Sequence, residues 1–252
     1  MLKVHSYESM GTYDGPGLRL VVFLQGCPFR CLYCANPDTI AFEGGTPTEV
    51  EEIVSMAVSQ KPFFGKRGGV TFSGGEPTMQ AKDLLPLYAR LKEEGINICI
   101  DTNGGAWNSD IEELLRQTDL VLLDCKQFND ARHESLTGRS NAQTIKTAEW
   151  LEQNGKPFWL RYVLVPGISD FEEDIRALGE HFKEYKMLRR VEILPYHTLG
   201  QHKYESLGWK YQLEGTPHNT PEQLDKALAL FKEYFDCAVM NYGEKDVVAT
   251  TD

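Results

Sequence analysis

The sequence lacks several features that would place it in other classes of protein. Its 252 residues contain no uninterrupted apolar run near the roughly 20 residues that span a bilayer, so we predict no membrane helix. The first residues, Met1 to His5, lack the apolar core and cleavage site of a secretory signal. We therefore expect a cytoplasmic protein. Thiols stay reduced there, so the six cysteines do not predict a disulfide framework.

Positive charge is also scarce. The chain has 26 Lys and Arg residues against 37 Asp and Glu residues, a formal net charge of -11. General binding of nucleic acid depends on Lys and Arg that neutralise phosphates, and no basic run compensates for the deficit. We predict no nucleic-acid partner.

Internal repeats, low-complexity tracts and linkers are absent as well, so we predict one domain over residues 1–252. Within it we distinguish an N-terminal segment and loop (1–17), a core (18–200) and a C-terminal extension with a helix (201–252).

Short apolar runs rich in β-branched and aromatic residues alternate with amphipathic patterns. The runs predict six strands: Leu18–Gly26, Gly69–Ser73, Asn97–Asp101, Leu120–Lys126, Phe158–Val165 and Val191–Tyr196. The amphipathic patterns predict helices over Thr48–Ser59, Ala81–Glu94, Ser109–Gln117, Ala142–Gln153, Asp170–Tyr185 and Pro221–Phe235, the first with a capping box from Thr48 to Glu51. This alternation favours parallel strands joined by right-handed crossovers. Six strands are too few for a closed eight-stranded barrel, so the fold class is α/β, an open partial (β/α)6 barrel.

Polar residues follow the ends of the predicted strands. They include the cysteines after the first strand, Gly74 to Glu76 after the second, Asp101 after the third, Asp124 and Lys126 at the fourth, and His197 after the sixth. The carboxyl ends of parallel strands meet at one edge of the sheet, where α/β proteins place their sites. We expect these residues to serve one site.

Three cysteines, Cys27, Cys31 and Cys34, share one loop with C-x3-C-x2-C spacing. A closed zinc site and a complete four-cysteine cluster both need a fourth ligand, which is missing. On spacing alone, zinc with a distant fourth ligand and unrelated core cysteines remain alternatives to an iron–sulfur cluster with one open iron. Cys99, Cys125 and Cys237 lie in apolar surroundings, and we predict buried structural thiols there.

The loop, with Tyr33 between two of its cysteines, resembles the signature of the radical S-adenosylmethionine (SAM) superfamily. The closer resemblance is to the family of pyruvate formate-lyase activating enzymes, and it covers nearly the whole chain. The matching segments are His5–Ser9, Gly11–Gly17, Gln25–Cys27, Ser73–Glu76, Asp101–Gly104, Asp124–Lys126, Arg161–Gly167 and Leu194–Gly200.

The resemblance implies a radical SAM core in which a [4Fe–4S] cluster on the three cysteines reductively cleaves SAM. The resulting 5′-deoxyadenosyl radical would take a hydrogen from a glycine Cα of pyruvate formate-lyase. It also implies a reduced flavodoxin-like electron donor, and we expect a monomer. No cysteine occurs between Cys34 and Cys99, whereas many activases of other glycyl radical enzymes carry extra cysteine clusters in that part of the chain. An activase of such another enzyme, an iron–sulfur electron carrier and a structural zinc protein remain alternatives.

Residue roles follow from the same resemblance. SAM contacts are expected from Tyr33, Cys34, Ala35, Gly74, Gly75, Glu76, Asp101, Asp124, Cys125, Lys126 and His197. Asp101, Thr102 and Asp124 match positions that hold a monovalent cation beside the SAM carboxylate. Ala35 departs from the family, which often has histidine there, so only its backbone can contribute. Asp14, on the substrate side, and Arg161 are candidates for contact with the substrate peptide; a plain turn and a buried ion pair are their respective alternatives.

Overall fold

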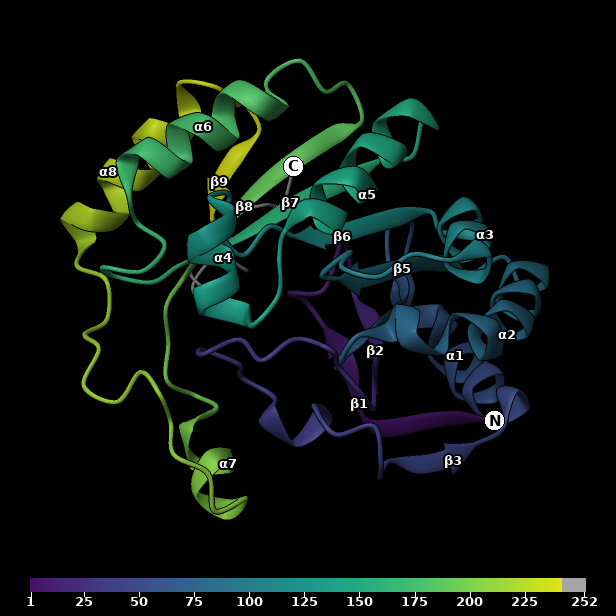
Figure 1. Cartoon of the computed structure of the whole chain (residues 1–252). Helices are drawn as coiled ribbons and strands as arrows, with labels where there is room; N and C mark the ends of the chain where they lie inside the picture. Colours follow the sequence, from purple (N-terminus) through teal and green to yellow (C-terminus); the bar gives the residue numbers. More distant parts are fainter. Residues whose placement is uncertain (242–252) are drawn as a thin grey trace. The chain divides into compact units, whose positions relative to one another are not determined.

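The computed structural model describes residues 1–241 (Figure 1). Residues 242–252, the end of the predicted C-terminal extension, lie outside the described part. The chain divides into two compact units. The first comprises residues 1–28 and 38–122, and the second comprises residues 29–37 and those from 123 onward. The cysteine loop spans this division, with Cys27 in the first unit and Cys31 and Cys34 in the second.

The strands of the first unit follow the order β3-β1-β2-β4-β5-β6. β1 (Leu2–Gly11) pairs antiparallel with β2 (Arg19–Leu24) and with β3 (Thr46–Thr48). β2, β4 (Gly69–Gly74) and β5 (Asn97–Thr102) are parallel. Side chains of β2 and β4 are almost all buried, as expected for parallel strands covered on both faces.

Three helices of the first unit follow one another along the chain beside these strands: α1 (Val50–Phe64), α2 (Ala81–Glu93) and α3 (Ser109–Gln117) (Figure 1). Two short 3-10 turns, η1 (Pro37–Thr39) and η2 (Pro77–Gln80), lie in the connections. Asn108 caps α3, because its side-chain oxygen accepts a hydrogen bond from the backbone N–H of Ile111 at 2.9 Å.

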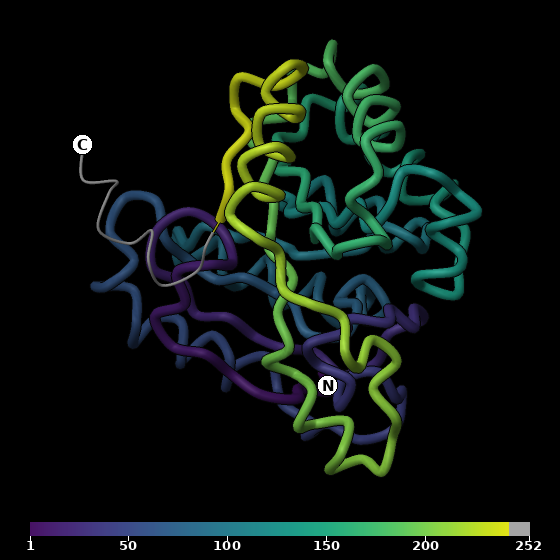
Figure 2. The backbone as a smooth tube through the Cα atoms, turned by 90° about the vertical axis from the view of Figure 1, so that its left-hand side faces the viewer, coloured from purple at the N-terminus to yellow at the C-terminus, as the bar shows by residue number. Residues whose placement is uncertain are grey.

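β6 (Leu120–Asp124) contains the division between the units, so it also begins the strand order of the second, β6-β7-β8-β9. β7 (Phe158–Leu164), β8 (Leu188–Pro195) and β9 (Ala238–Met240) are parallel. The helices of this unit are α4 (Asp130–Thr137), α5 (Ala142–Gln153), α6 (Glu172–Phe182), α7 (Gln201–Ser206) and α8 (Pro221–Lys232). A long connection that contains α7, yellow-green in Figure 2, joins β8 to α8.

The α/β class and the open sheet are confirmed, because the strand order is linear with β3 and β9 at its ends. All six predicted strands are present as β2 and β4–β8, and the six predicted helices as α1–α3, α5, α6 and α8. The predicted capping box was wrong by one residue: Glu49 is the N-cap, and its backbone N–H donates to Glu52, while Thr48 belongs to β3. The single-domain organisation stays a prediction. None of the helices in residues 1–241 is long and apolar enough to cross a membrane.

Candidate radical SAM site

Cys27 follows β2 and lies in a loop that backbone hydrogen bonds hold in place. Its N–H donates to the carbonyl of Ile40 at 3.0 Å, and the N–H of Gly26 donates to Thr39 at 2.8 Å. Gly26 has a φ of 100°, a conformation that glycine adopts without steric cost. The first cysteine therefore begins its loop at a fixed point of the first unit.

The backbone around Cys31 lies against the last turn of α4 in the second unit. Backbone N–H groups on both sides of Cys31 donate to carbonyls there: Arg30 to Thr137 at 2.7 Å and Leu32 to Leu136 at 3.0 Å. The final carbonyls of a helix have no partner within it, so α4 offers the loop ready acceptors. The rings of Phe29 and His133 on α4 meet edge to face, with centroids 5.7 Å apart.

The connection that contains α7 covers the loop around Cys34 within the second unit. The Tyr204 hydroxyl donates to the carbonyl of Cys34 at 3.2 Å, and Lys203 donates to the side chain of Asn36 at 2.8 Å. Gly200 approaches Ala35 so closely that a Cβ there would lie 2.6 Å from the Ala35 carbonyl oxygen. The backbone at Ala35 is therefore held by contact with a segment far along the chain.

The two glycines at the end of β4, Gly74 and Gly75, are required by the packing of the first unit. A Cβ on Gly74 would lie 2.3 Å from the backbone nitrogen of Leu24, and one on Gly75 would lie 2.4 Å from the carbonyl oxygen of Gly26. These glycines bring the end of β4 against the start of the cysteine loop. This packing is a structural reason for both glycines, and their contact with SAM stays a prediction.

The Glu76 carboxylate is buried and links the Ser73–Glu76 segment to the Asp101–Gly104 segment. One of its oxygens accepts hydrogen bonds from the hydroxyls of Thr78 at 2.6 Å and Thr102 at 2.7 Å and from the Thr78 N–H at 3.1 Å. The other accepts from the backbone N–H of Asn103 at 2.8 Å. Burial raises the pKa of Glu76, while its four hydrogen bonds act in the opposite direction. The side chain thus fixes the end of β5 and the residue that follows it. Within β5, Asp101 accepts from the Ser73 hydroxyl at 2.8 Å.

In the second unit, Lys126 donates to the Asp124 carboxylate at 2.8 Å and lies 5.7 Å from the centre of the Tyr33 ring. Burial acts to lower the pKa of Lys126, but the nearby Asp124, Tyr33 and Cys31 groups outweigh it and raise this pKa well above its usual value. For the Cys31 thiol, burial acts in the other direction and raises its pKa to about 12, while the nearby Lys126 acts to lower it. The structure thus gathers an ammonium, a carboxylate, an aromatic ring and a thiol that were all predicted for the site.

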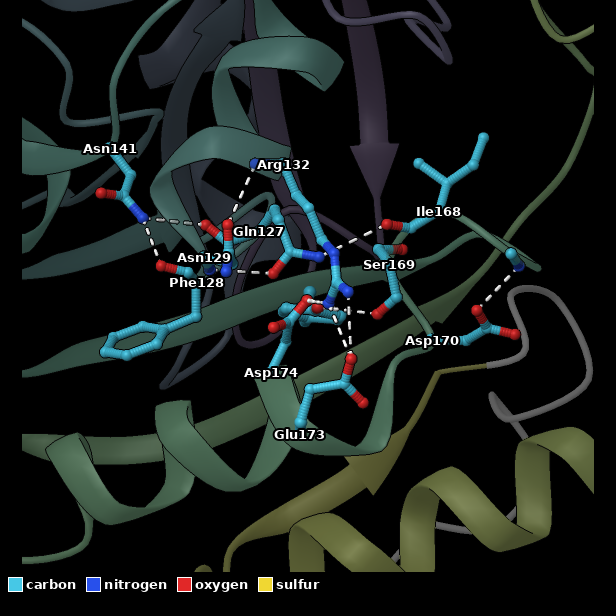
Figure 3. Close-up of polar contacts among 12 residues, drawn as sticks. Gln127, Phe128, Asn129, Arg132, Asn141, Ile168, Ser169, Asp170, Glu173 and Asp174 are labelled. Atoms are coloured by element: carbon cyan, nitrogen blue, oxygen red, sulfur yellow. Dashed lines mark hydrogen bonds and ion pairs between the residues drawn. The ribbon is translucent and has the colours of Figure 1, made fainter.

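The segment after Lys126 is fixed by buried amides (Figure 3). The fully buried Gln127 side chain donates to the carbonyl of Ile168 at 3.3 Å and accepts from the N–H of Asn129 at 3.1 Å. Asn141 donates to the carbonyls of Gln127 and Phe128 at 3.2 and 2.6 Å. These bonds tie the chain beside Lys126 to the loop after β7 and to the start of α5.

Arg132 on α4 completes this network. Its guanidinium donates to Asp174 at 2.5 Å and to Glu173 at 3.0 Å (Figure 3). It also lies 3.8 Å from the centre of the Phe171 ring. The Asp174 side chain is only 5% exposed. Arg132 therefore anchors the helix whose last turn holds the cysteine loop.

We expect Arg132→Met to lower the free energy of unfolding measurably, because it leaves the buried Asp174 carboxylate without its cation. Arg176→Met is the matched control, because Arg176 bridges Glu172 on α6 and Glu233 just after α8, and both carboxylates are largely exposed. Its loss should change the stability clearly less than the loss of Arg132, because solvent screens an exposed pair. Urea unfolding of the protein without cofactors measures both, and equal losses would contradict a special role for the buried pair.

The remaining predicted residues have contacts of their own within each unit. The backbone carbonyl of Asp14 accepts from the Thr71 hydroxyl at 2.6 Å. Arg161 lies 3.5 Å from the buried Glu192, the ion pair that the sequence left open as an alternative. His197 is exposed, and its Nδ1 accepts from the N–H of Leu199 at 3.4 Å. Cys125 is buried, and its N–H donates to the carbonyl of Arg161 at 3.0 Å.

The three thiols of the loop suit a four-iron cluster in number and chemistry. All six cysteines lie in the described residues, and none forms a disulfide. Within residues 1–241, no three His, Cys, Asp or Glu side chains converge as ligands of a single metal ion. A four-iron cluster presents a different iron to each thiolate, so its ligands need not converge on one point. Soft thiolates are its normal ligands, and three of them leave one iron open.

Two residues that contact the cysteine loop, Tyr204 and Asn103, were not predicted from the sequence as site residues. Tyr204 covers Cys34 from a segment in which no motif marked it. The Asn103 side chain donates to the sulfur of Cys27 at 3.9 Å, and it was quoted only as part of the Asp101–Gly104 match. The position of Asn103 directly after a strand was the only available signal.

Comparison with known proteins shows the family to which the chain belongs. The family model described as Radical SAM superfamily matches residues 21–179. The pyruvate formate-lyase-activating enzyme of Streptococcus mutans is 45% identical over 235 residues, 90% of this chain and 89% of that protein. The pyruvate formate-lyase 1-activating enzyme of Escherichia coli K12 is 42% identical, over 92% of this chain and 96% of that one. The pyruvate formate-lyase-activating enzyme of Staphylococcus epidermidis is 46% identical, over 90% of this chain and 94% of that protein.

The chain therefore belongs to the radical SAM superfamily and, within it, to the family of pyruvate formate-lyase-activating enzymes. Solved structures support the fold. Streptococcus suis SuiB bound to its precursor peptide SuiA aligns with a TM-score of 0.72 at 18% identity, over 91% of this chain and 50% of that one. A domain of a pyruvate-formate lyase-activating enzyme from Bacteroides vulgatus aligns with a TM-score of 0.59 at 22% identity, over 69% of this chain and 99% of that domain.

Proposed function

We propose that this chain generates the glycyl radical of pyruvate formate-lyase by reductive cleavage of SAM at a [4Fe–4S] cluster. The observation that carries the proposal is the loop of three thiols in a chain whose relatives, 42–46% identical, are named as activating enzymes of that protein. Cys27, Cys31 and Cys34 are the proposed cluster ligands. When bound, the cluster supplies one electron to the SAM sulfonium, which yields the radical that takes a hydrogen from the partner's glycine Cα.

The chain's own residues bind and orient SAM in this proposal. Lys126 forms an ion pair with Asp124, which acts to raise its pKa, and its ammonium group suits the SAM carboxylate. The Tyr33 ring offers an aromatic face for adenine. Backbone groups at Ala35, Gly74 and Gly75 are proposed to bind the methionine part, next to Glu76. Asp101, Thr102 and Asp124 are the proposed oxygen ligands of a monovalent cation, and His197 and the segment at Cys125 are proposed to complete the SAM contacts.

The partner side is proposed on the same family basis. Asp14 and Arg161 are the candidate contacts for the glycine-bearing peptide, and a reduced flavodoxin-like protein is the proposed electron donor. We further propose that the chain acts as a cytoplasmic monomer and that residues 1–252 form one functional domain.

Anaerobic reconstitution followed by electron paramagnetic resonance tests the choice of partner. The protein with cluster and SAM is incubated with pyruvate formate-lyase and, separately, with a glycyl radical dehydratase. The proposal predicts a glycyl radical signal on pyruvate formate-lyase. A signal on the dehydratase alone would favour the activase of another enzyme, and absence of 5′-deoxyadenosine would favour an electron carrier.

A further inference from the structure

Asn103 connects the segment after β5 to the first cysteine of the loop. It is 4% exposed, and its side-chain nitrogen lies 3.9 Å from the sulfur of Cys27. Both residues belong to the first unit. Sulfur is larger than oxygen, so this distance is within the range of an N–H···S hydrogen bond.

The orientation of the Asn103 amide is fixed by its neighbours. An amide has one oxygen that accepts and one nitrogen that donates, and hydrogen-bond partners decide which end points where. The Asn103 oxygen accepts from the backbone N–H of Gly105 at 2.9 Å, and that group can only donate. The donating nitrogen must therefore be the end that faces Cys27.

The backbone of Asn103 is equally constrained. Its N–H donates to the buried Glu76 carboxylate at 2.8 Å, and the N–H of Gly104 donates to the Thr102 hydroxyl at 3.0 Å. The same Thr102 hydroxyl donates to Glu76 at 2.7 Å. The amide is thus held in place by the protein alone, so it needs no rearrangement when Cys27 binds a cluster.

We propose that the Asn103 side chain tunes the reduction potential of the cluster through a hydrogen bond to the Cys27 sulfur. This inference rests on the proposed function, because it requires a cluster at Cys27. Hydrogen bonds to the sulfurs of an iron–sulfur cluster help to set its potential, since they stabilise the reduced state, which carries one more negative charge. Asn103 raises the potential and makes one-electron reduction easier. It acts through Cys27, so it is a positioning residue.

The test is a redox titration, followed by electron paramagnetic resonance, of the reconstituted wild type and two variants. Asn103→Asp keeps the shape and the acceptor for Gly105, but it replaces the donor with a negatively charged oxygen. Asn103→Leu removes the donor without adding charge. We expect the potential to fall from wild type to Leu to Asp. For the Asp variant we expect roughly a tenfold drop in the ratio of reduced to oxidised cluster at a fixed potential, equivalent to about 59 mV for one electron.

Asn141→Asp is the matched control. Asn141 is also buried, and its amide nitrogen donates to the backbone carbonyls of Gln127 and Phe128, so the substitution makes the same chemical change at two carbonyls instead of at a cysteine sulfur. It should titrate at the wild-type potential. Asn103→Ser, which restores a small donor, should recover part of the shift.

Two outcomes would overturn the inference. One is a wild-type potential in Asn103→Asp and Asn103→Leu with about four irons per chain. The other is failure of these variants to load iron although circular dichroism shows a folded chain, because a bond that only tunes the potential is not required for ligation. Failure of the proposed function is distinguishable, since then the wild type itself would hold no cluster or cleave no SAM.

Discussion

Cys31→Ser is expected to abolish cluster-dependent cleavage of SAM. Loss of a residue that only supports a metal ligand commonly reduces metal affinity or activity about 10- to 100-fold, and loss of a ligand should exceed that. We expect less than about a hundredth of the wild-type rate of 5′-deoxyadenosine formation. Iron and sulfide analysis after anaerobic reconstitution should show loss of the four-iron cluster in the same variant.

Cys237→Ser is the control for Cys31→Ser. Cys237 is also partly exposed and lies in the second unit, but it precedes β9, outside the loop. It should retain the cluster and most of the activity. If both variants lost the cluster equally, or if Cys31→Ser kept four irons and full activity, the assignment of the loop as the cluster site would be wrong.

Glu76→Ala is expected to give the largest loss of stability. The substitution leaves a cavity and deprives two hydroxyls and two backbone N–H groups of their common acceptor. A buried polar group without a partner costs about 1–3 kcal/mol, so we expect a loss of about 4 kcal/mol once the site relaxes. For a chain of this length that lowers the melting temperature by roughly 10 °C.

Glu76→Gln should lose about half as much, because it keeps the shape but turns an amide N–H toward the N–H of Asn103. Glu51→Gln is the surface control. Glu51 is exposed and pairs with Arg90, so its loss should leave the melting temperature close to that of the wild type. Melting curves of the protein without cofactors measure all three variants. A Glu76→Ala variant as stable as Glu51→Gln would show that the carboxylate does not hold the segment after β5.

The core strands could be predicted because their environment leaves a clear signal in the sequence. β2 and β4 are buried on both faces, so they are continuous apolar runs. β1 was missed because most of its side chains are exposed and its pairing with β2 contains register shifts, so no simple alternation appears. α4 was missed because its eight residues lack an apolar stripe, and its stability comes from contacts such as Arg132 to Asp174.

The candidate site shows the same contrast. The cysteine spacing, Lys126 and Asp124 were visible as local patterns. Asn103 forms hydrogen bonds with Cys27, which is 76 positions away along the chain, and with Glu76, which is 27 positions away. A local sequence pattern does not contain such contacts. The packing reason for Gly74 and Gly75, close approach to Leu24 and Gly26, likewise depends on the pairing of β2 with β4.

Transfer of a hydrogen atom from a glycine of the partner to a radical derived from SAM can be followed with an isotope. Pyruvate formate-lyase labelled with deuterium at glycine Cα is incubated anaerobically with the reduced protein and SAM. We expect a glycyl radical on the partner and one deuterium in the 5′-deoxyadenosine. A glycyl radical formed with unlabelled 5′-deoxyadenosine, or SAM cleavage with no radical on the partner, would contradict this expectation.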